Sequence, residues 1–528
     1  MKRLSKKQMI IFAIGQLGWS LLSGIISAWL VTYYLPTHGD VDAGATNYII
    51  PGLAIGGFMT VLGLITALSR VFDAVTDPLI ASLSDRSKNP RGRRIPFMMV
   101  AAVPLAIVTV LLFCAPVGGQ SPLNIVWISI FIVLFYLFMT MYCTPYNALI
   151  SEFGKTQEDR MFISTSISLT FFAGTLLAYL PFVLAGAGIN ADTGAYEPKL
   201  ITGLLVNGGM TQIDAYTWSF RISFIVLAVI ATVCMLLPTF LLKEKEFVDT
   251  KPSEENVVKS LVSTFKNKDF RTFSLSDIMY WVGLTMFQTG LPFFVKVSMG
   301  FDAGMVMVFM GGMTVLSAVF YPFVTGLVKK FGKKKLVIAG FLGLAVCYSI
   351  AAISSIPNLL PTQGNANALS WVFGIIIMVI AALPMALLGI IPQSIVADVA
   401  EAEAVTTGEN REGMFFAART FAMKFGQSLA MILFTSLAVA MPDPASTADE
   451  VFPGKGGMIL VAAVAVAFCV AGAIILLFYR EKKVMRTIAK EGDEAFLKAI
   501  EGEKEIGEKQ EPVVEEQPEP KKEEKENW

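Results

Sequence analysis

Residues 70–96, RVFDAVTDPLIASLSDRSKNPRGRRIP, place two carboxylates inside an apolar segment and a basic cluster directly after it. The preceding residues, YIIPGLAIGGFMTVLGLITALS, are long enough to cross a bilayer core of about 30 Å, for which roughly 20 residues suffice. Asp73 and Asp77 therefore lie at membrane depth. Residues three and four apart share a helix face, so Arg70 and both aspartates point to one side. That side faces the protein interior and indicates an ion or substrate pathway, because charges in lipid are costly.

The composition is that of a membrane protein with many spans. Of the 528 residues, 54% are hydrophobic and only 16% are charged, and the mean hydropathy is +0.62. A soluble domain would carry about 25% charged residues. The single histidine, His38, lies in a polar loop, and the five cysteines are scattered singly. We therefore expect neither a disulfide framework nor a metal site.

Apolar segments of spanning length recur twelve times, in two groups of six. The first group covers residues 9–34, 50–84, 96–116, 124–150, 161–188 and 218–242, and the second covers 272–298, 302–328, 336–356, 369–395, 414–441 and 457–479. This pattern predicts an all-α membrane protein with twelve transmembrane helices in two six-helix halves, at 1–242 and 272–480. A charged cytoplasmic linker, 243–271, separates them. The charged tail, 481–528, is expected to be mostly disordered after one amphipathic helix near 484–500.

Basic residues gather in the loops on one side of these spans. Lysines and arginines precede span 1 and follow spans 2 and 8, whereas alternate loops such as LPTHGDVDAGATN carry essentially none. The positive-inside rule then places both termini in the cytoplasm. We expect the protein to lie in the plasma membrane. The basic stretch after span 8, GLVKKFGKKKLVIAG, also echoes the one after span 2. Two parallel six-span repeats are typical of the major facilitator fold, which binds substrate between its halves.

Several stretches resemble the glycoside–pentoside–hexuronide:cation symporter family, the melibiose permease-like branch of the major facilitator superfamily. They are FAIGQLGWSLLSGIISAWLVTYYLP, RVFDAVTDPLIASLSDRSKNPRGRRIPF, YCTPYNALISEFGKTQEDR, LPFFVKVSMG and ADVAEAEAVTTGENREGMFFAARTFAMKFGQSL. The resemblance covers all twelve spans and leaves out the tail. It implies cation-coupled symport of a sugar or glycoside by alternating access, with Na⁺, Li⁺ or H⁺ as the coupling cation and no cofactor.

Carried over by position, the resemblance implies a cation site at Asp73, Asp77 and Thr140, and a coupling role for Lys424. The physical chemistry agrees, because two carboxylates one helical turn apart in a low dielectric cannot both stay ionised without a cation between them. Lys424 and Arg70 would compete for these carboxylates when the cation leaves. The alternative is a permanent buried salt-bridge network that only ties the halves together.

The expected substrate-binding residues depart from melibiose permease. The candidates are polar or aromatic and fall on spans 1, 4, 5 and 11: Trp19, Ser20, Cys143, Thr144, Asn147, Ser168 and Lys424. At positions 20, 143, 147 and 168, melibiose permease has two acids, an aromatic residue and an arginine. Without the acids, charge-assisted hydrogen bonds to sugar hydroxyls are largely missing, so a melibiose-like galactoside is not expected. Trp19 could equally be an interfacial anchor.

The resemblance also suggests a cytoplasmic gate made of charged residues. Its members are Asp85, Arg86, Arg93, Arg94, Asp398 and Arg411. Ion pairs of Asp85 with the arginines of its loop, and of Asp398 with Arg411, would close the inner side in one state and break in the other. The alternative is that these arginines only set the topology.

Other functional classes fit the sequence less well. An enzyme would need a catalytic set at membrane depth, but the spans hold no histidine and no HExxH or GxSxG motif, so we expect no catalytic residue. A transport-incompetent sensor would need a signalling domain, and the tail is too short and polar for one. Within transport, a lysolipid remains the rival substrate. We expect a monomer that contacts the lipid bilayer and a small-molecule substrate, with no nucleic-acid partner.

Overall fold

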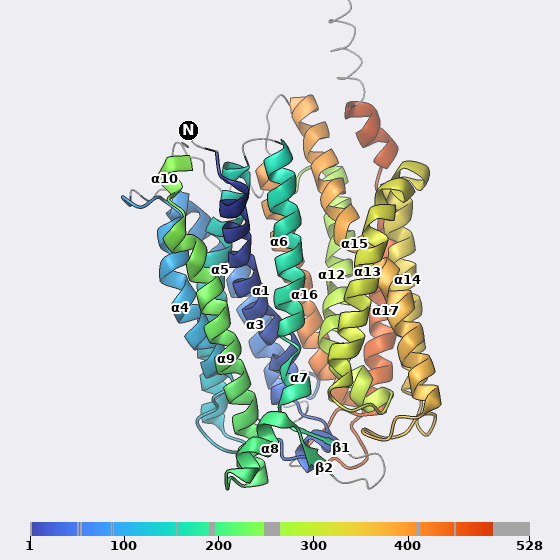
Figure 1. The fold of residues 1–528 in the computed structure, drawn as a ribbon. Coiled ribbons are helices and arrows are strands. Elements are labelled where there is room, and N and C mark those ends of the chain that lie inside the picture. Colours follow the sequence, from blue (N-terminus) through green and yellow to red (C-terminus); the bar gives the residue numbers. More distant parts are fainter. Residues whose placement is uncertain are drawn as a thin grey trace, which may run out of the picture.

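The computed structural model describes residues 3–49, 52, 55–85, 87, 89–154, 157–189, 196–247, 264–407, 412–447 and 450–488. Its long helices run side by side in one bundle (Figure 1). We call the end of the bundle where the first helix begins the near end, and the opposite end the far end.

The long helices form two groups. The first group is α1 (Lys6–Tyr34), α3 (Val61–Asp85), α4 (Ile95–Leu112), α5 (Pro122–Phe153), α6 (Gln157–Leu177) with the short α7 (Pro181–Leu184), and α9 (Gln212–Leu241). The second group is α12 (Lys268–Phe293) with the π-helical turn η1 (Phe294–Ser298), α13 (Met305–Phe331), α14 (Lys333–Ser354), α15 (Ala368–Thr407), α16 (Glu412–Ala440) and α17 (Lys455–Leu477). Helices pack mainly within their own group, on the left and right of Figure 1. The predicted two-half helical architecture is confirmed.

Among the described residues, eleven segments are long and apolar enough to cross a membrane. The twelfth helix, α3, has 25 residues but carries three charged residues in its middle. Its leucines Leu68 and Leu79 are 60% and 57% exposed, whereas Asp73 is only 4% exposed. The helix therefore turns an apolar face outward and Asp73 inward, as the sequence predicted.

Some predicted helix bounds need correction. The span predicted at 50–84 is wrong at its start, because α3 begins at Val61. Gly56 and Gly57 have φ angles of 62° and 76°, which glycine tolerates but a right-handed helix does not continue. The helix predicted at 369–395 extends to Thr407, and α12 begins within the predicted linker.

Short elements occupy both ends of the bundle. At the far end, α2 (His38–Asp42) follows α1, and an antiparallel ribbon of β1 (Ala187–Ile189) and β2 (Tyr196–Pro198) leads into α8 (Leu200–Asn207). The sequence pattern did not indicate the ribbon. At the near end lie α10 (Glu244–Phe247) and a helix at 481–488. Linker residues 248–263 lie outside the described residues, as does the tail from 489 onward, for which disorder was predicted.

Candidate functional site

The aspartates of α3 lie in a polar cluster in the middle of the bundle. Lys424 of α16 places its Nζ 2.8 Å from Asp73 Oδ2 and 2.6 Å from Asp77 Oδ2. The hydroxyl of Thr140 on α5 lies 2.7 Å from Asp73 Oδ1 and 3.2 Å from Asp77 Oδ1. The structure therefore brings together the three residues of the predicted cation site and the predicted coupling lysine, from both halves of the chain.

This cluster is shielded from solvent. The side chains of Asp73 and Lys424 are 6% and 10% exposed, and that of Asp77 is 26% exposed. With both carboxylates ionised, the single ammonium neutralises half of their charge, and one negative charge remains within the cluster. In a low-dielectric site such an excess favours the entry of a cation or a proton.

The packing of α16 on α3 sets this geometry. A Cβ atom added to Gly63 would lie 2.3 Å from Thr435 Oγ1, so the glycine permits the close approach of the two helices. Nearer the aspartates, the hydroxyl of Ser428 donates to the carbonyl oxygen of Ala67 at 2.9 Å. Because Lys424 precedes Ser428 by one turn, these contacts hold its ammonium opposite the aspartates.

Arg70 does not join the cluster. Its guanidinium carbon lies 4.6 Å from the ring centroid of Tyr136 on α5, which is a cation–π contact. In the part of the chain that the structure describes, no ion pair joins Arg70 to Asp73 or Asp77. The expectation that Arg70 competes directly with Lys424 for the carboxylates is therefore not met in this conformation.

Three predicted substrate-binding residues lie on α5 beside the aspartates. Cys143, Thr144 and Asn147 follow Thr140 by three, four and seven residues, so all four share one helix face. Asn147 is exposed, and the other two are half-buried. This face of α5 can contact a solute that binds next to the aspartates.

The remaining substrate candidates lie on α1 and α6. The Trp19 ring packs near Phe171, with centroids 6.3 Å apart, and its Nε1 atom is buried without a hydrogen-bond partner among the described residues. Ser168 is exposed and donates to a backbone carbonyl of its own helix. Ser20 is not placed with the others, because it is 1% exposed and packs directly against Gly174 of α6.

Charged residues at the near end pair within the first half. Arg93 and Arg94 both contact Glu152 at the end of α5. The backbone N–H groups of residues 93–95 donate to the carboxylate of Glu244 in α10, which satisfies unpaired donors at the start of α4. No role was predicted for Glu152 or Glu244, although two adjacent arginines indicate a need for nearby acids.

Within the second half, Lys333 donates to Asp398 at 2.6 Å. The predicted gate residues Arg86 and Arg411 and the side chain of Asp85 lie outside the described residues. A gate formed across the two halves at this end therefore stays a prediction.

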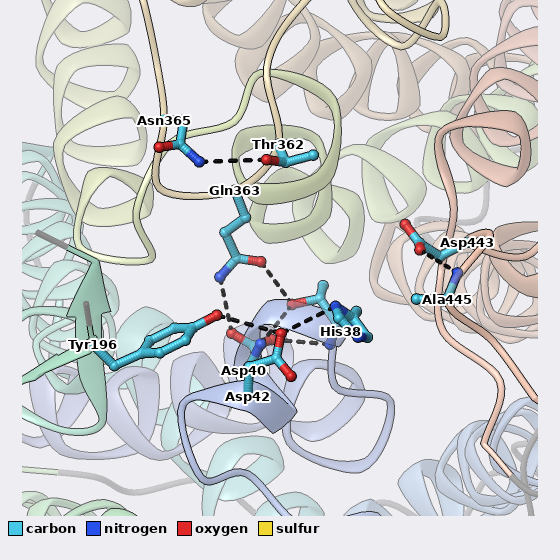
Figure 2. Close-up of polar contacts among 10 residues, drawn as sticks. His38, Asp40, Asp42, Tyr196, Thr362, Gln363, Asn365, Asp443 and Ala445 are labelled. Carbon is cyan, nitrogen blue, oxygen red and sulfur yellow. Dashed lines mark hydrogen bonds and ion pairs between the residues drawn. The ribbon is translucent and has the colours of Figure 1, made fainter. Parts of the chain in front are cut away.

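At the far end, polar contacts cross between the halves (Figure 2). Asp40 of α2 forms a buried ion pair with Lys296 of η1. Gln363, in the loop between α14 and α15, donates to Asp40 at 3.3 Å and accepts from Thr37 at 2.8 Å. We call these four residues the far-end latch. Beside it, Figure 2 shows Tyr196 and His38 turned toward Asp42.

The latch is ionic at neutral pH. Burial alone would raise the pKa of the Asp40 carboxyl, but the Lys296 ammonium and hydrogen bonds from Thr37 outweigh it and lower that pKa. A second bridge between the halves joins Lys199 to Asp302 at 3.0 Å. The sequence could not pair Asp40 with Lys296, because 256 positions separate them.

The second half holds an intramembrane ion pair that was not predicted from the sequence. Arg419 of α16 donates to Asp277 of α12 from its Nε atom at 2.9 Å and from a terminal nitrogen at 3.2 Å. Arg419 is 9% exposed and Asp277 is 2% exposed. A charged residue within each of two apolar spans was the available signal, because charges at membrane depth need partners.

Known proteins share the sequence pattern of this chain. Residues 11–482 match the family described as MFS/sugar transport protein. The uncharacterized symporter YjmB of Bacillus subtilis (strain 168) is 26% identical over 482 residues, which cover 88% of this chain and 91% of that protein. The putative glycoside/cation symporter YagG of Escherichia coli (strain K12) is 25% identical over 279 residues, or 53% of this chain and 52% of that protein.

A further relative matches this chain over a local stretch, and a solved structure shares its fold. The sodium-dependent lysophosphatidylcholine symporter 1 of Xenopus tropicalis is 32% identical over 130 residues, or 22% of this chain and 25% of that protein. Among solved structures, a D-xylose-proton symporter has a TM-score of 0.58 at 14% identity, with 90% of this chain and 98% of that chain covered. Since the family match runs through both helical halves, the chain belongs to the MFS/sugar transport protein family of membrane transporters.

Proposed function

We propose that this protein couples the movement of a cation to the symport of a sugar or glycoside by alternating access. The observation that carries the proposal is the position of the Lys424 ammonium between Asp73 and Asp77, with Thr140 beside them. Oxygen atoms from carboxylates and a hydroxyl suit Na⁺ or Li⁺. A proton could instead neutralise one carboxylate.

The cation and Lys424 compete for the same carboxylate oxygens. A cation that enters between Asp73 and Asp77 releases the ammonium and weakens the contact of α16 with α3, which belong to different halves. If substrate binds better once Lys424 has been released, then by linkage the substrate raises the affinity for the cation by the same factor. This reciprocity is the thermodynamic basis of coupled transport.

The described contacts between the halves fit one state of such a cycle. The latch and the Lys199–Asp302 bridge join the halves at the far end. At the near end, the Arg93–Glu152 and Lys333–Asp398 ion pairs each lie within one half. With the cytoplasmic termini that the positive-inside rule predicts, we infer from these contacts an inward-facing conformation.

Uptake by proteoliposomes tests the proposal. The full chain is reconstituted, Na⁺, Li⁺ and pH gradients are imposed separately, and labelled glycosides, pentoses, uronides and lysolipids are supplied. We expect one cation gradient to drive accumulation of a sugar or glycoside, and Asp77→Asn to abolish it by removing one of the two charges. The control is Asp443→Asn at the far end, whose side chain caps the backbone of Ala445 at 3.0 Å. Undiminished accumulation by Asp77→Asn would refute the cation site, and accumulation of a lysolipid alone would favour the rival substrate.

A further inference from the structure

Two buried polar atoms in the middle of the second half lack hydrogen-bond partners among the described residues. They are Thr285 Oγ1 on α12 and Gln427 Oε1 on α16. The indole ring of Trp281 lies one turn before Thr285, and its N–H interacts with the Asp277 carboxylate. The Thr285 residue is 8% exposed. An unpaired buried polar group costs about 1–3 kcal/mol, so such groups in a native protein call for an explanation such as a ligand.

These three residues lie at one level of the bundle. Arg419 contacts Asp277, and a Cβ atom added to Gly426 would lie 3.1 Å from Trp281 Cβ. The two helices are therefore parallel and in register, with Gln427 beside Trp281 and the following turn. At 1.5 Å per residue, Trp281 and Gln427 both lie about 20 Å from the near-end starts of their helices.

Gln427 faces the space between the halves. On α16, Lys424 and Ser428 mark the side that meets α3, while Arg419 and Gly426 mark the side that meets α12. At 100° per residue, Gln427 points between these two sides. The exposed Phe425, at 54%, lies on the opposite side of the helix. The amide is therefore turned away from lipid and toward the interior, one turn from Lys424.

On α12, Thr285 follows Trp281 by four residues, so both share a face. Asp277 precedes Trp281 by one turn and is bound by Arg419, which fixes the neighbouring charge in place. The face thus offers an indole ring and a hydroxyl, and Gln427 adds an amide carbonyl that can accept a hydrogen bond.

We propose that Trp281, Thr285 and Gln427 form a substrate subsite in the second half, and that this subsite binds a hydroxyl-rich solute such as a sugar ring. The inference deepens the proposed symport function and rests on it. The indole plane contacts the C–H face of the ring, while the hydroxyl groups of the solute exchange hydrogen bonds with Thr285 and Gln427. Apolar walls with a few placed polar groups are the usual composition of small-molecule sites. A lysolipid would leave these polar atoms facing an acyl chain.

Binding to the purified full chain tests the subsite. Isothermal titration calorimetry in Na⁺ buffer uses D-xylose, methyl β-D-glucoside, D-glucuronate and lysophosphatidylcholine as probes. We expect at least one of the three sugars to bind, and Gln427→Leu and Thr285→Val each to weaken that binding about tenfold. A tenfold change corresponds to about 1.4 kcal/mol, the contribution of one hydrogen bond. The matched control is Thr289→Val, one turn further along α12, whose hydroxyl contacts Met431 Sδ at 3.7 Å. It should bind sugar like the parent.

Thermal unfolding without sugar separates a binding role from a structural one. Replacing an unpaired buried hydroxyl or amide by an apolar group of similar shape should leave the melting temperature unchanged or raise it. The proposal is overturned if no sugar binds, if only lysophosphatidylcholine binds, if both variants bind sugar like the parent, or if they lose stability in the absence of sugar. Symport itself would survive each of these results, provided that Asp77→Asn still abolishes gradient-driven uptake.

Discussion

Replacing Lys424 by alanine should make the stability of the protein depend on the coupling cation. In the parent, the ammonium lies within 2.8 Å of both Asp73 and Asp77. Lys424→Ala leaves the buried carboxylate of Asp73 and the half-buried carboxylate of Asp77 without a positive partner. Without the cation, we therefore expect Lys424→Ala to unfold more readily than the parent.

The magnitude follows from the burial of this cluster. Removing one partner of a buried ionic contact costs about 3–5 kcal/mol, because the charge left behind is uncompensated. A cation present at a concentration of 100 times its dissociation constant stabilises the state that binds it by about 2.7 kcal/mol. In Lys424→Ala the cation need not displace an ammonium, so its stabilising effect should exceed that in the parent.

Thermal unfolding followed by tryptophan fluorescence measures this effect. The parent and Lys424→Ala are compared in choline, Na⁺ and Li⁺ chloride and over a pH series, so that a proton-coupled carrier is also detected. In proteoliposomes, Lys424→Ala should lose gradient-driven accumulation while substrate exchange continues. The control is Lys334→Ala, whose ammonium binds the backbone oxygens of Leu477 and Tyr479 and lies outside the cluster. A Lys424→Ala protein that accumulates substrate like the parent, with no greater response to any cation, would refute the coupling role.

Three further predictions concern the far end and the topology. Asp40→Asn leaves Lys296 buried without its counter-ion, so hydrogen exchange in α2 and around Gln363 should quicken; unchanged exchange would contradict the latch. Because the pKa of Asp40 is lowered from its ordinary 3.8, the latch contributes fully above that pH and is lost only as pH falls through the lowered value. Exchange should therefore stay constant between about pH 5 and 7, and opening in this window would show that another group controls the far end. An accessibility tag at Asp443 should react from outside intact cells, and a tag at Lys509 should not; the reverse labelling would invert the assigned orientation.

The sequence predicted the fold because apolar length and charge spacing act locally. Spanning segments are visible without any tertiary information, and the spacing of Asp73 and Asp77 fixes a shared helix face. Helix spacing could not place Thr140 and Lys424 beside these aspartates, because periodicity identifies a helix face and not the helix opposite to it. Their placement came only from the resemblance to a family. Arg70 shows this limit, because its face was predicted but its partner, Tyr136, was not.

The sequence pattern could not predict contacts between distant segments, for the same reason. Asp40 and Lys296 each looked like an isolated charge near a span end, and their pairing depends on how η1 meets α2. The pairing of Asp277 with Arg419 depends on the register of α12 and α16. The predicted start of α3 was wrong for a different reason. The segment before Val61 is apolar, but it contains two glycines whose positive φ angles keep the helix from starting earlier.

The chemistry of the contacts between the halves suits a gate that must open and close. A buried ion pair gains little over hydrophobic residues of similar volume, because the attraction of its charges only offsets their loss of hydration. When the far end opens, water can hydrate Asp40 and Lys296 separately, so the latch separates at little net cost. An apolar seal would lose about 25 cal/mol for each Å² exposed to water. The Lys424 contact is of the same ionic kind, but there a cation or proton, not water, takes the place of the ammonium. Separation of α16 from α3 at this site can therefore depend on the coupling cation.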